Sequence, residues 1–330
     1  MTCRRRLPVA FSLLTVLAGL GFVVESGMPL QARAPGPFVL TYFLGNGESG
    51  LHLAYSRDGL KFEPVGEGES VLVPAVGGKL MRDTCISPGP DNEFHAVWTT
   101  GWWEPGIGLS HSKDLLTWSE PEFLPVMMHE RGAVNAWAPE ILWDQETQQY
   151  IIFWATTIPG RFPTTDQSGD TGRDGVELNH RIYRTTTRDF KEYTKAELFY
   201  DPGFNVIDAT ILKDGSRFIM FMKDETKRPE PKKHIRVARA DHALGPYVLQ
   251  PDPLPGENYV EGPTAYRSGG EIVVLFDAFT RERFEGVKTR DLKKWEPIGD
   301  KIEVPAGARH GTVLAVPDRI LKALLARKPK

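Results

Sequence analysis

The sequence predicts an all-β protein, a five-bladed β-propeller with one blade closed by strands from both chain ends. The main observation is a phrase that occurs five times, in which an aspartate follows an apolar run and an aromatic residue comes four to six positions later. These aspartates, spaced by 56, 75, 52 and 50 residues, are Asp58, Asp114, Asp189, Asp241 and Asp291. Each phrase follows two runs rich in Val, Ile, Phe, Tyr and Trp, which is typical of a radial array of sheets. Five units of about four strands therefore predict five blades.

The 330-residue chain, with 41% hydrophobic and 25% charged residues, is large enough for one propeller but not for a second large domain. Arg4 to Arg6 precede an apolar stretch from Val9 to Val24. Ala32 to Ala34 have the pattern of two small residues around a third residue at which signal peptides are cleaved. We therefore expect a signal peptide over 1–34, the propeller over 35–330, and a periplasmic or secreted bacterial protein. A retained membrane anchor is the alternative, because about 17 apolar residues approach the length of a span.

The charge balance excludes some partners. Removal of the leader takes away four of 40 basic and one of 43 acidic residues, which leaves a net charge of −6. Nucleic acid is therefore an unsuitable partner, and we expect a monomer without membrane association after cleavage. Cys85 is the one cysteine beyond the leader, so no internal disulfide is expected. Its apolar surroundings favour core packing over a role as nucleophile.

The strand order follows from the phrase, which covers the end of the third strand of a unit, a turn at the aspartate and the start of the fourth strand. The innermost strands are then expected at 82–88, 137–143, 207–213, 261–267 and 309–315. Residues 37–65 supply three strands without an inner one, and 309–316 supply an inner strand without a blade. The two ends therefore complete one blade together, which pairs strand edges that would otherwise be exposed. Apolar residues at helical spacing in 318–330 predict a short outer helix.

Long connections between the second and third strands of a blade gather on the face where the inner strands begin, and ligands bind there. The longest is an insertion from 158 to 179, which accounts for the interval of 75 residues. Within it, Asp166 to Glu177 nearly match a calcium-binding EF-hand loop, but the glycine is displaced and no flanking helices are predicted. We therefore interpret the insertion as a polar loop that forms one wall of the pocket.

Acidic residues occur on four predicted inner strands, at Asp83, Glu140, Asp208 and Glu261. Carboxylates brought toward one axis repel each other, so one of them is expected to keep a proton near neutral pH. General acid and base catalysis requires one protonated and one ionised carboxyl group side by side. The alternative is that these residues form hydrogen bonds that join the blades, as in propellers that only bind ligands.

Short motifs surround these acidic residues in order along the chain. They are Asp83, Asn135 to Glu140, Asn205 to Ala209, Val260 to Pro263 and Arg309 to Gly311. The series resembles glycoside hydrolase family 43 over nearly the whole chain beyond the leader. The resemblance implies an inverting glycosidase that releases terminal α-L-arabinofuranosyl or β-D-xylosyl residues from plant-type glycans, with no cofactor needed for the chemistry.

The resemblance also implies residue roles. Asp83 is the expected general base and Glu261 the general acid, while Asp208 orients the acid and raises its pKa. Inversion requires the base and the acid to stand about 6.5 to 9.5 Å apart. The family usually has proline after the base, where this chain has Thr84, and this departure favours a rival function, glycan binding without hydrolysis. A related hydrolase acting on galactosyl-type glycans is a second alternative.

Other residues are candidates for binding the sugar or a metal ion. The aromatic platforms that a sugar requires are expected at Trp102, Trp103 and Trp137. Glu140 is expected to support the site or to bind a substrate hydroxyl, and Arg309 to contact sugar hydroxyls or to restrain a carboxylate. His310 resembles the histidine that helps to hold a hydrated, structural Ca²⁺ on the propeller axis in many members of the family. A core histidine paired with a carboxylate is the alternative.

Overall fold

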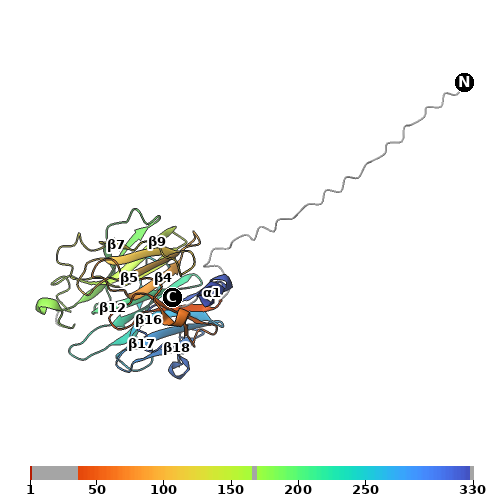
Figure 1. The fold of residues 1–330 in the computed structure, drawn as a ribbon. Helices are drawn as coiled ribbons and strands as arrows, with labels where there is room; N and C mark the ends of the chain where they lie inside the picture. The colour runs from red at the N-terminus through yellow and green to blue at the C-terminus, as the bar shows by residue number, and fades with distance from the viewer. Residues whose placement is uncertain (2–35, 166–168, 328–330) are drawn as a thin grey trace.

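Five antiparallel sheets of four strands each form a five-bladed β-propeller (Figure 1). The computed structural model describes Met1 and residues 36–165 and 169–327. The predicted signal peptide, apart from Met1, lies outside the described residues and stays a prediction. Within the described part, no helix is both long and apolar enough to span a membrane.

The strands follow the predicted order from the axis to the rim. The first blade contains β20 (Val313–Ala315), β1 (Phe38–Tyr42), β2 (His52–Ser56) and β3 (Glu63–Pro64). The second contains β4 (Arg82–Pro88), β5 (Phe94–Thr99), β6 (Ile107–Ser112) and β7 (Glu122–Leu124). The third contains β8 (Trp137–Asp144), β9 (Gln149–Thr157), β10 (His180–Thr187) and β11 (Glu197–Tyr200). The fourth contains β12 (Val206–Asp214), β13 (Arg217–Asp224), β14 (His234–Ala240) and β15 (Val248–Leu249). The fifth contains β16 (Glu261–Ser268), β17 (Glu271–Ala278), β18 (Arg283–Thr289) and β19 (Glu296–Pro297).

The closure of the ring by both chain ends is confirmed. The strand β1 pairs with β2 on one side and with β20 on the other, where Val39 lies opposite Leu314. The inner strand β20 is shorter than expected, because only 313–315 form a ladder and Arg309 makes an isolated bridge to Phe43. Arg309 and His310 therefore lie in the segment that leads into this strand.

The predicted outer helix is α1 (Asp318–Leu325). It buries Ile320, Leu321 and Leu324, while Leu325 is exposed. Two of these side chains join a core cluster that also contains Val39 and Leu314. The helix thus packs over the junction of the two chain ends, beside the strands that close the ring (Figure 1).

The repeated phrase forms a turn at the rim. All five third strands end at the first residue of the phrase, and in four phrases the aspartate side chain accepts the backbone N–H groups of the residues two and three positions later. Such bonds hold the chain in a turn. The phrase at Asp241 has no such bonds in the described structure and continues instead to Gly245 and Pro246.

The core lies within and between the sheets. Trp98 and Trp154 are fully buried, and Cys85 is 3% exposed within an apolar cluster. The surroundings of Cys85 also raise the pKa of its thiol, and burial is the largest cause. The interpretation of Cys85 as a core residue is therefore confirmed, since a reactive cysteine needs an accessible thiolate.

A β-bulge near the start of four inner strands determines which side chains face the axis. In each, one extra residue interrupts the register with the second strand, and a residue at the bulge has a positive φ. These residues are Asp83, Ala138, Asp208 and Gly262, with φ of 55°, 45°, 52° and 55°. Asp83 and Asp208 therefore occupy equivalent positions, whereas Glu261 comes one residue before its bulge and Glu140 two residues after.

Candidate active site

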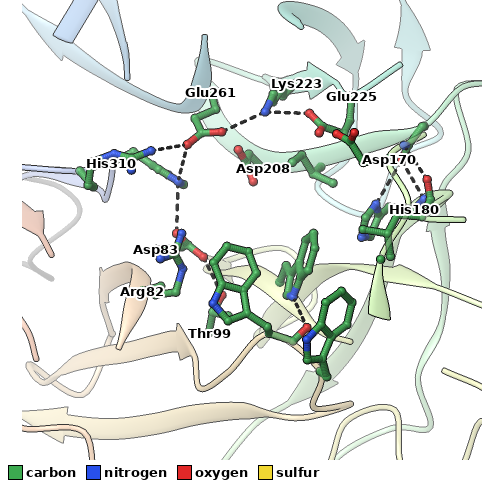
Figure 2. Close-up of a pocket in the computed structure, with 18 of the residues that line it drawn as sticks. Arg82, Asp83, Thr99, Asp170, His180, Asp208, Lys223, Glu225, Glu261 and His310 are labelled. Atoms are coloured by element: carbon green, nitrogen blue, oxygen red, sulfur yellow. Dashed lines mark hydrogen bonds and ion pairs between the residues drawn. The ribbon is translucent and has the colours of Figure 1, made fainter. Parts of the chain in front are cut away.

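A cavity of about 810 Å³ lies at the entrance ends of the inner strands. The predicted catalytic carboxylates Asp83, Asp208 and Glu261 all line it, and Figure 2 shows them around a common space. Each comes from the inner strand of a different blade, β4, β12 or β16. The fold thus brings together three acidic residues that are separated by more than 50 positions in the sequence.

Asp83 is held as a carboxylate. Thr99 donates a hydrogen bond to its Oδ2 atom at 2.8 Å, and the Nε2 atom of His310 lies 3.2 Å from Oδ1. Burial alone would raise the pKa of Asp83, but the imidazolium of His310, with help from Arg82 and Thr99, lowers it to about 2. The same contact raises the pKa of His310 to about 9 against the opposing effect of burial. Asp83 is therefore ionised at any ordinary pH, as a general base must be.

Glu261 is held between two cations. Lys223 donates to its Oε2 atom at 2.9 Å, and Arg309 donates to its Oε1 atom at 2.7 Å. Burial would raise the pKa of Glu261, yet Lys223, His310 and Arg309 lower it to about 2. This direction is opposite to the one that the resemblance implies for a general acid.

Asp208 carries the raised pKa instead. Its Oδ2 atom accepts the backbone N–H of Gly262 at 3.0 Å, and the side chain is buried. Burial raises the pKa of Asp208 to about 6, with a further contribution from the charges of Glu261 and Asp83 and an opposing one from His310 and Lys223. Among Asp83, Asp208 and Glu261, Asp208 therefore keeps its proton to the highest pH, about 6. Glu140, whose pKa is about 8, is the acidic residue that keeps a proton near neutral pH.

The contacts of His310 limit the separation of Asp83 and Glu261. The Nε2 atom of His310 lies 3.2 Å from Asp83 Oδ1 and 4.0 Å from Glu261 Oε1. These two oxygens are thus no more than about 7 Å apart, so only the lower end of the range expected for inversion is open to them.

The three predicted tryptophans also line the cavity. The ring of Trp137 lies 5.6 Å from that of Trp102 and 6.1 Å from that of Trp103 between centroids. The indole N–H of Trp137 donates to the backbone oxygen of Trp102 at 2.8 Å. The cavity therefore has an aromatic wall as well as charged groups, as a sugar with one apolar face requires.

Glu140 does not line the large cavity. It lines a much smaller one of about 20 Å³, which it shares with Asp83, Asp208 and His310. Thr210 donates to it at 2.8 Å, and burial raises its pKa to about 8. Because Glu140 follows its bulge by two residues, it belongs to this lower layer, which favours support of the site over contact with a substrate hydroxyl.

Arg309 bonds to two carboxylates. Its Nη2 atom donates to Glu261, and its Nε atom donates to Asp277 Oδ2 at 2.6 Å. Of the two roles that the sequence left open, restraint of a carboxylate therefore matches these contacts. Arg309 also lines the cavity, so it remains within reach of a ligand.

The contacts of His310 differ from those of a metal ligand. A metal ligand must be a neutral imidazole, whereas the bond to Asp83 keeps His310 protonated. Within the residues that the structure describes, no group of three or more His, Cys, Asp or Glu side chains could hold a metal ion. His310 thus has the carboxylate partner of the alternative, and the Ca²⁺ on the axis stays a prediction.

The insertion forms one wall of the cavity, as predicted, through residues that include Asp170, Gly172 and Leu178. Its acidic groups pair with cations of the next blade. Asp170 contacts Lys233 at 3.3 Å as well as Lys227. Residues 166–168 of the sequence that resembles a calcium loop lie outside the described residues. The ion pairs of its remaining part match the interpretation as a polar loop.

Lys223, Glu225 and Asp277 are residues of the site that sequence reasoning missed. Lys223 is 3% exposed and also contacts Glu225 at 2.7 Å. It lies near the end of β13, after the apolar run from Phe218 to Met222. A lysine at the entrance end of an otherwise apolar strand was the available signal, but its partner Glu261 comes from the next blade.

Comparisons with known proteins agree with this fold and site. A family model described as a probable glycosyl hydrolase domain, from a family related to glycoside hydrolase family 43, matches residues 36–320. An α-L-arabinofuranosidase of Bifidobacterium longum subsp. longum is 26% identical over 186 residues, 51% of this chain. That match covers only 17% of the arabinofuranosidase.

Solved structures show the same fold at low identity. A thermostable family 43 glycoside hydrolase has a TM-score of 0.54 and 15% identity, over 74% of this chain and 82% of that one. A family 43 β-1,3-galactosidase with galactodeoxynojirimycin has a TM-score of 0.54 and 10% identity, over 75% and 86% of the two chains.

A five-bladed propeller with one central cavity defines the structural class, which the chain shares with solved structures of glycoside hydrolase family 43. Within this class, the chain belongs to the glycosyl hydrolase family related to family 43. Membership of this family favours hydrolysis over glycan binding alone, the alternative that the residue after Asp83 had left open.

Proposed function

We propose that the chain is an inverting glycosidase that releases terminal α-L-arabinofuranosyl or β-D-xylosyl residues from plant-type glycans. The observation that carries the proposal is the presence, in one cavity, of a carboxylate at Asp83 with a pKa lowered to about 2 and a carboxyl group at Asp208 with a pKa raised to about 6. The similarity to a protein named α-L-arabinofuranosidase supports the choice of sugar. The predicted leader over 1–34 supports action in the periplasm or outside the cell.

In the proposed reaction, Asp83 accepts a proton from a water molecule that attacks the anomeric carbon. The bond from that carbon to the leaving oxygen breaks, and the oxygen receives a proton from the acid. We assign this donation to Glu261, with Asp208 as the group that holds the proton in the free enzyme. Because the two carboxyl groups influence each other's titration, the proton belongs to the pair rather than to one residue.

The sugar and the stereochemistry can be tested together. Purified protein is incubated with aryl glycosides of arabinofuranose, xylose and galactose and with natural oligosaccharides, and the first anomer released is identified by ¹H NMR. The proposal expects turnover of the pentosides, with the anomer opposite to that of the substrate. Release of the same anomer would contradict inversion, and preference for galactosides would contradict the choice of sugar.

The roles of the carboxylates can be separated by the leaving group. Asp83→Asn is expected to lose activity on all substrates by about 10³-fold or more, because no base remains. Glu261→Gln is expected to retain activity on aryl glycosides whose leaving group needs no proton, and to lose it on natural linkages. If Asp208→Asn shows this selectivity and Glu261→Gln does not, Asp208 is the direct donor. The exposed residue Glu120, changed to Gln, is the matched control.

A further inference from the structure

Arg82 differs from the other cations that line the cavity. Lys223, Arg309 and His310 each contact a carboxylate of the site, and Arg173 contacts Asp174 at 3.3 Å. Among the residues that the structure describes, no carboxylate oxygen lies within 4.0 Å of a nitrogen of Arg82. The cavity therefore contains a guanidinium group whose charge no ion pair neutralises.

The side chain of Arg82 is nevertheless fixed in place. Its guanidinium carbon lies 4.4 Å from the ring centroid of Trp102 and 4.7 Å from that of Phe43. Its Nη1 atom donates to the side-chain oxygen of Asn46 at 3.1 Å, and the same oxygen accepts the indole N–H of Trp102 at 3.0 Å. Stacking over aromatic rings and one hydrogen bond hold an arginine while its other N–H groups stay available.

The backbone next to Arg82 is shaped around it. Gly47 has a φ of 92°, and a Cβ atom there would lie 2.8 Å from the Cγ atom of Arg82. Gly45 and Asn46 of this segment line the cavity together with Arg82 and Trp102. Trp102 is 41% exposed, so an apolar ring surface lies next to the positive charge.

These features suit a sugar that bears an anion. A pyranose ring can rest its C–H face on an indole, and a carboxylate matches the planar edge of a guanidinium through two parallel hydrogen bonds. We propose that Arg82 and Trp102 form a subsite for a uronic acid residue, so that the preferred glycans are acidic. This inference rests on the proposed function for the hydrolytic step, but not for the binding of the uronate.

Binding is tested first, without turnover. Methyl glucuronide and methyl galacturonide, together with the methyl esters of their carboxyl groups, are titrated against the intact protein, with tryptophan fluorescence as the signal. At least one uronate is expected to bind on the order of ten- to a hundredfold more tightly than its ester. Equal binding of both uronates and their esters would overturn the inference. A sulfated monosaccharide that binds more tightly than either uronate would overturn the assignment to a carboxylate.

The variants test whether Arg82 is responsible. Arg82→Met is expected to remove the preference for the uronate over its ester, and Arg82→Lys to reduce it, because an ammonium group keeps the charge but cannot form two parallel bonds. The exposed Arg188→Met is the control and should keep the full preference. An unchanged preference in Arg82→Lys and in a folded Arg82→Met would overturn the inference. Because the readout is a ratio of two ligands, a general loss of affinity does not alter it.

Hydrolysis separates this inference from the proposed function. Arabinosyl and xylosyl oligosaccharides are compared with and without a uronic acid next to the terminal sugar. Turnover of both at equal kcat/KM would uphold the proposed function and contradict the uronate subsite. Binding of uronates that depends on Arg82, without turnover of any pentoside, would uphold the subsite and contradict the proposed function.

Discussion

The charge of a single buried lysine influences which carboxyl group of the site holds a proton. Lys223 lies between Glu261 and Glu225 and is almost fully buried, and these carboxylates raise its pKa against the effect of burial. Its positive charge lowers the pKa of Glu261 directly and also opposes the rise at Asp208. Since Asp83 stays ionised at low pH, the loss of the proton near pH 6 from the pair of Asp208 and Glu261 should limit activity on the alkaline side.

This role of Lys223 predicts a shift in the pH profile. In the wild type, kcat/KM should fall as the pH rises past about 6, the pKa of Asp208. Lys223→Met removes a cation, which raises the pKa of both carboxyl groups, so the alkaline limb should move to higher pH. A control variant is Lys113→Met, whose side chain is 81% exposed. The profiles are measured with one aryl glycoside, and an unchanged or lower limb in a folded Lys223→Met would contradict the assignment.

At the scale of the element, the bulge and the rim turn have different functions. The bulge sets the direction of side chains at the axis, and at Gly262 it leaves no room for a side chain. A Cβ atom on Gly262 would lie 2.0 Å from the ring of His310. The rim turn lies far along the blade and stabilises the fold through bonds from the aspartate to the backbone.

The rim turns offer a matched comparison between repeats. Asp114 accepts the backbone N–H groups of Leu116 and Thr117 at 2.8 and 2.7 Å, whereas Asp241 accepts none in the described structure. Asp114→Ala should therefore reduce the free energy of unfolding by about 1 kcal/mol, and Asp241→Ala by less than about 0.5 kcal/mol. Urea denaturation at pH 7 measures both. Equal losses would show that the bonds to the backbone do not stabilise the turn.

The pH dependence of this effect has a definite sign. Burial would raise the pKa of Asp114, but the N–H groups of Thr117 and Leu116 lower it from the ordinary value of 3.8. A group with a lowered pKa in the folded state stabilises the fold above its unfolded pKa and loses this contribution as the pH falls. The difference between wild type and Asp114→Ala should therefore narrow below about pH 4.

For the whole molecule, stability depends on the closure of the ring. The pairing of β20 with β1 completes the first blade, because the other strands of this blade come from the start of the described chain. The helix α1 adds three buried apolar side chains over the same junction. An open ring would leave unpaired strand edges at β1 and would separate Arg309 and His310 from their partners in other blades.

Two shortened chains test the closure. A chain that ends at Pro317 loses α1 but keeps β20, and it should remain folded with a lower melting temperature, since several kcal/mol of apolar burial is lost. A chain that ends at Thr312 also loses β20, and it should lose both cooperative unfolding and activity. Thermal denaturation followed by circular dichroism compares the two with the full chain. If the chain ending at Thr312 melts like the one ending at Pro317, β20 does not hold the ring closed.

The sequence by itself determined the architecture. The five repeats of the aspartate phrase predicted the number of blades, because strand and turn preferences are local and recur in every blade. The unequal chain ends predicted the pairing of β20 with β1. It also identified Asp83, Asp208, Glu261 and the tryptophans as residues near the axis.

Only the tertiary structure decided which of these residues line the large cavity and which of them have a raised or a lowered pKa. The position of Glu140 two residues after its bulge keeps it out of the large cavity. The cations around Glu261 come from β13 and from the segment before β20. A pKa depends on charges within a few ångströms in space, and no local pattern in the sequence specifies which distant residues will lie there.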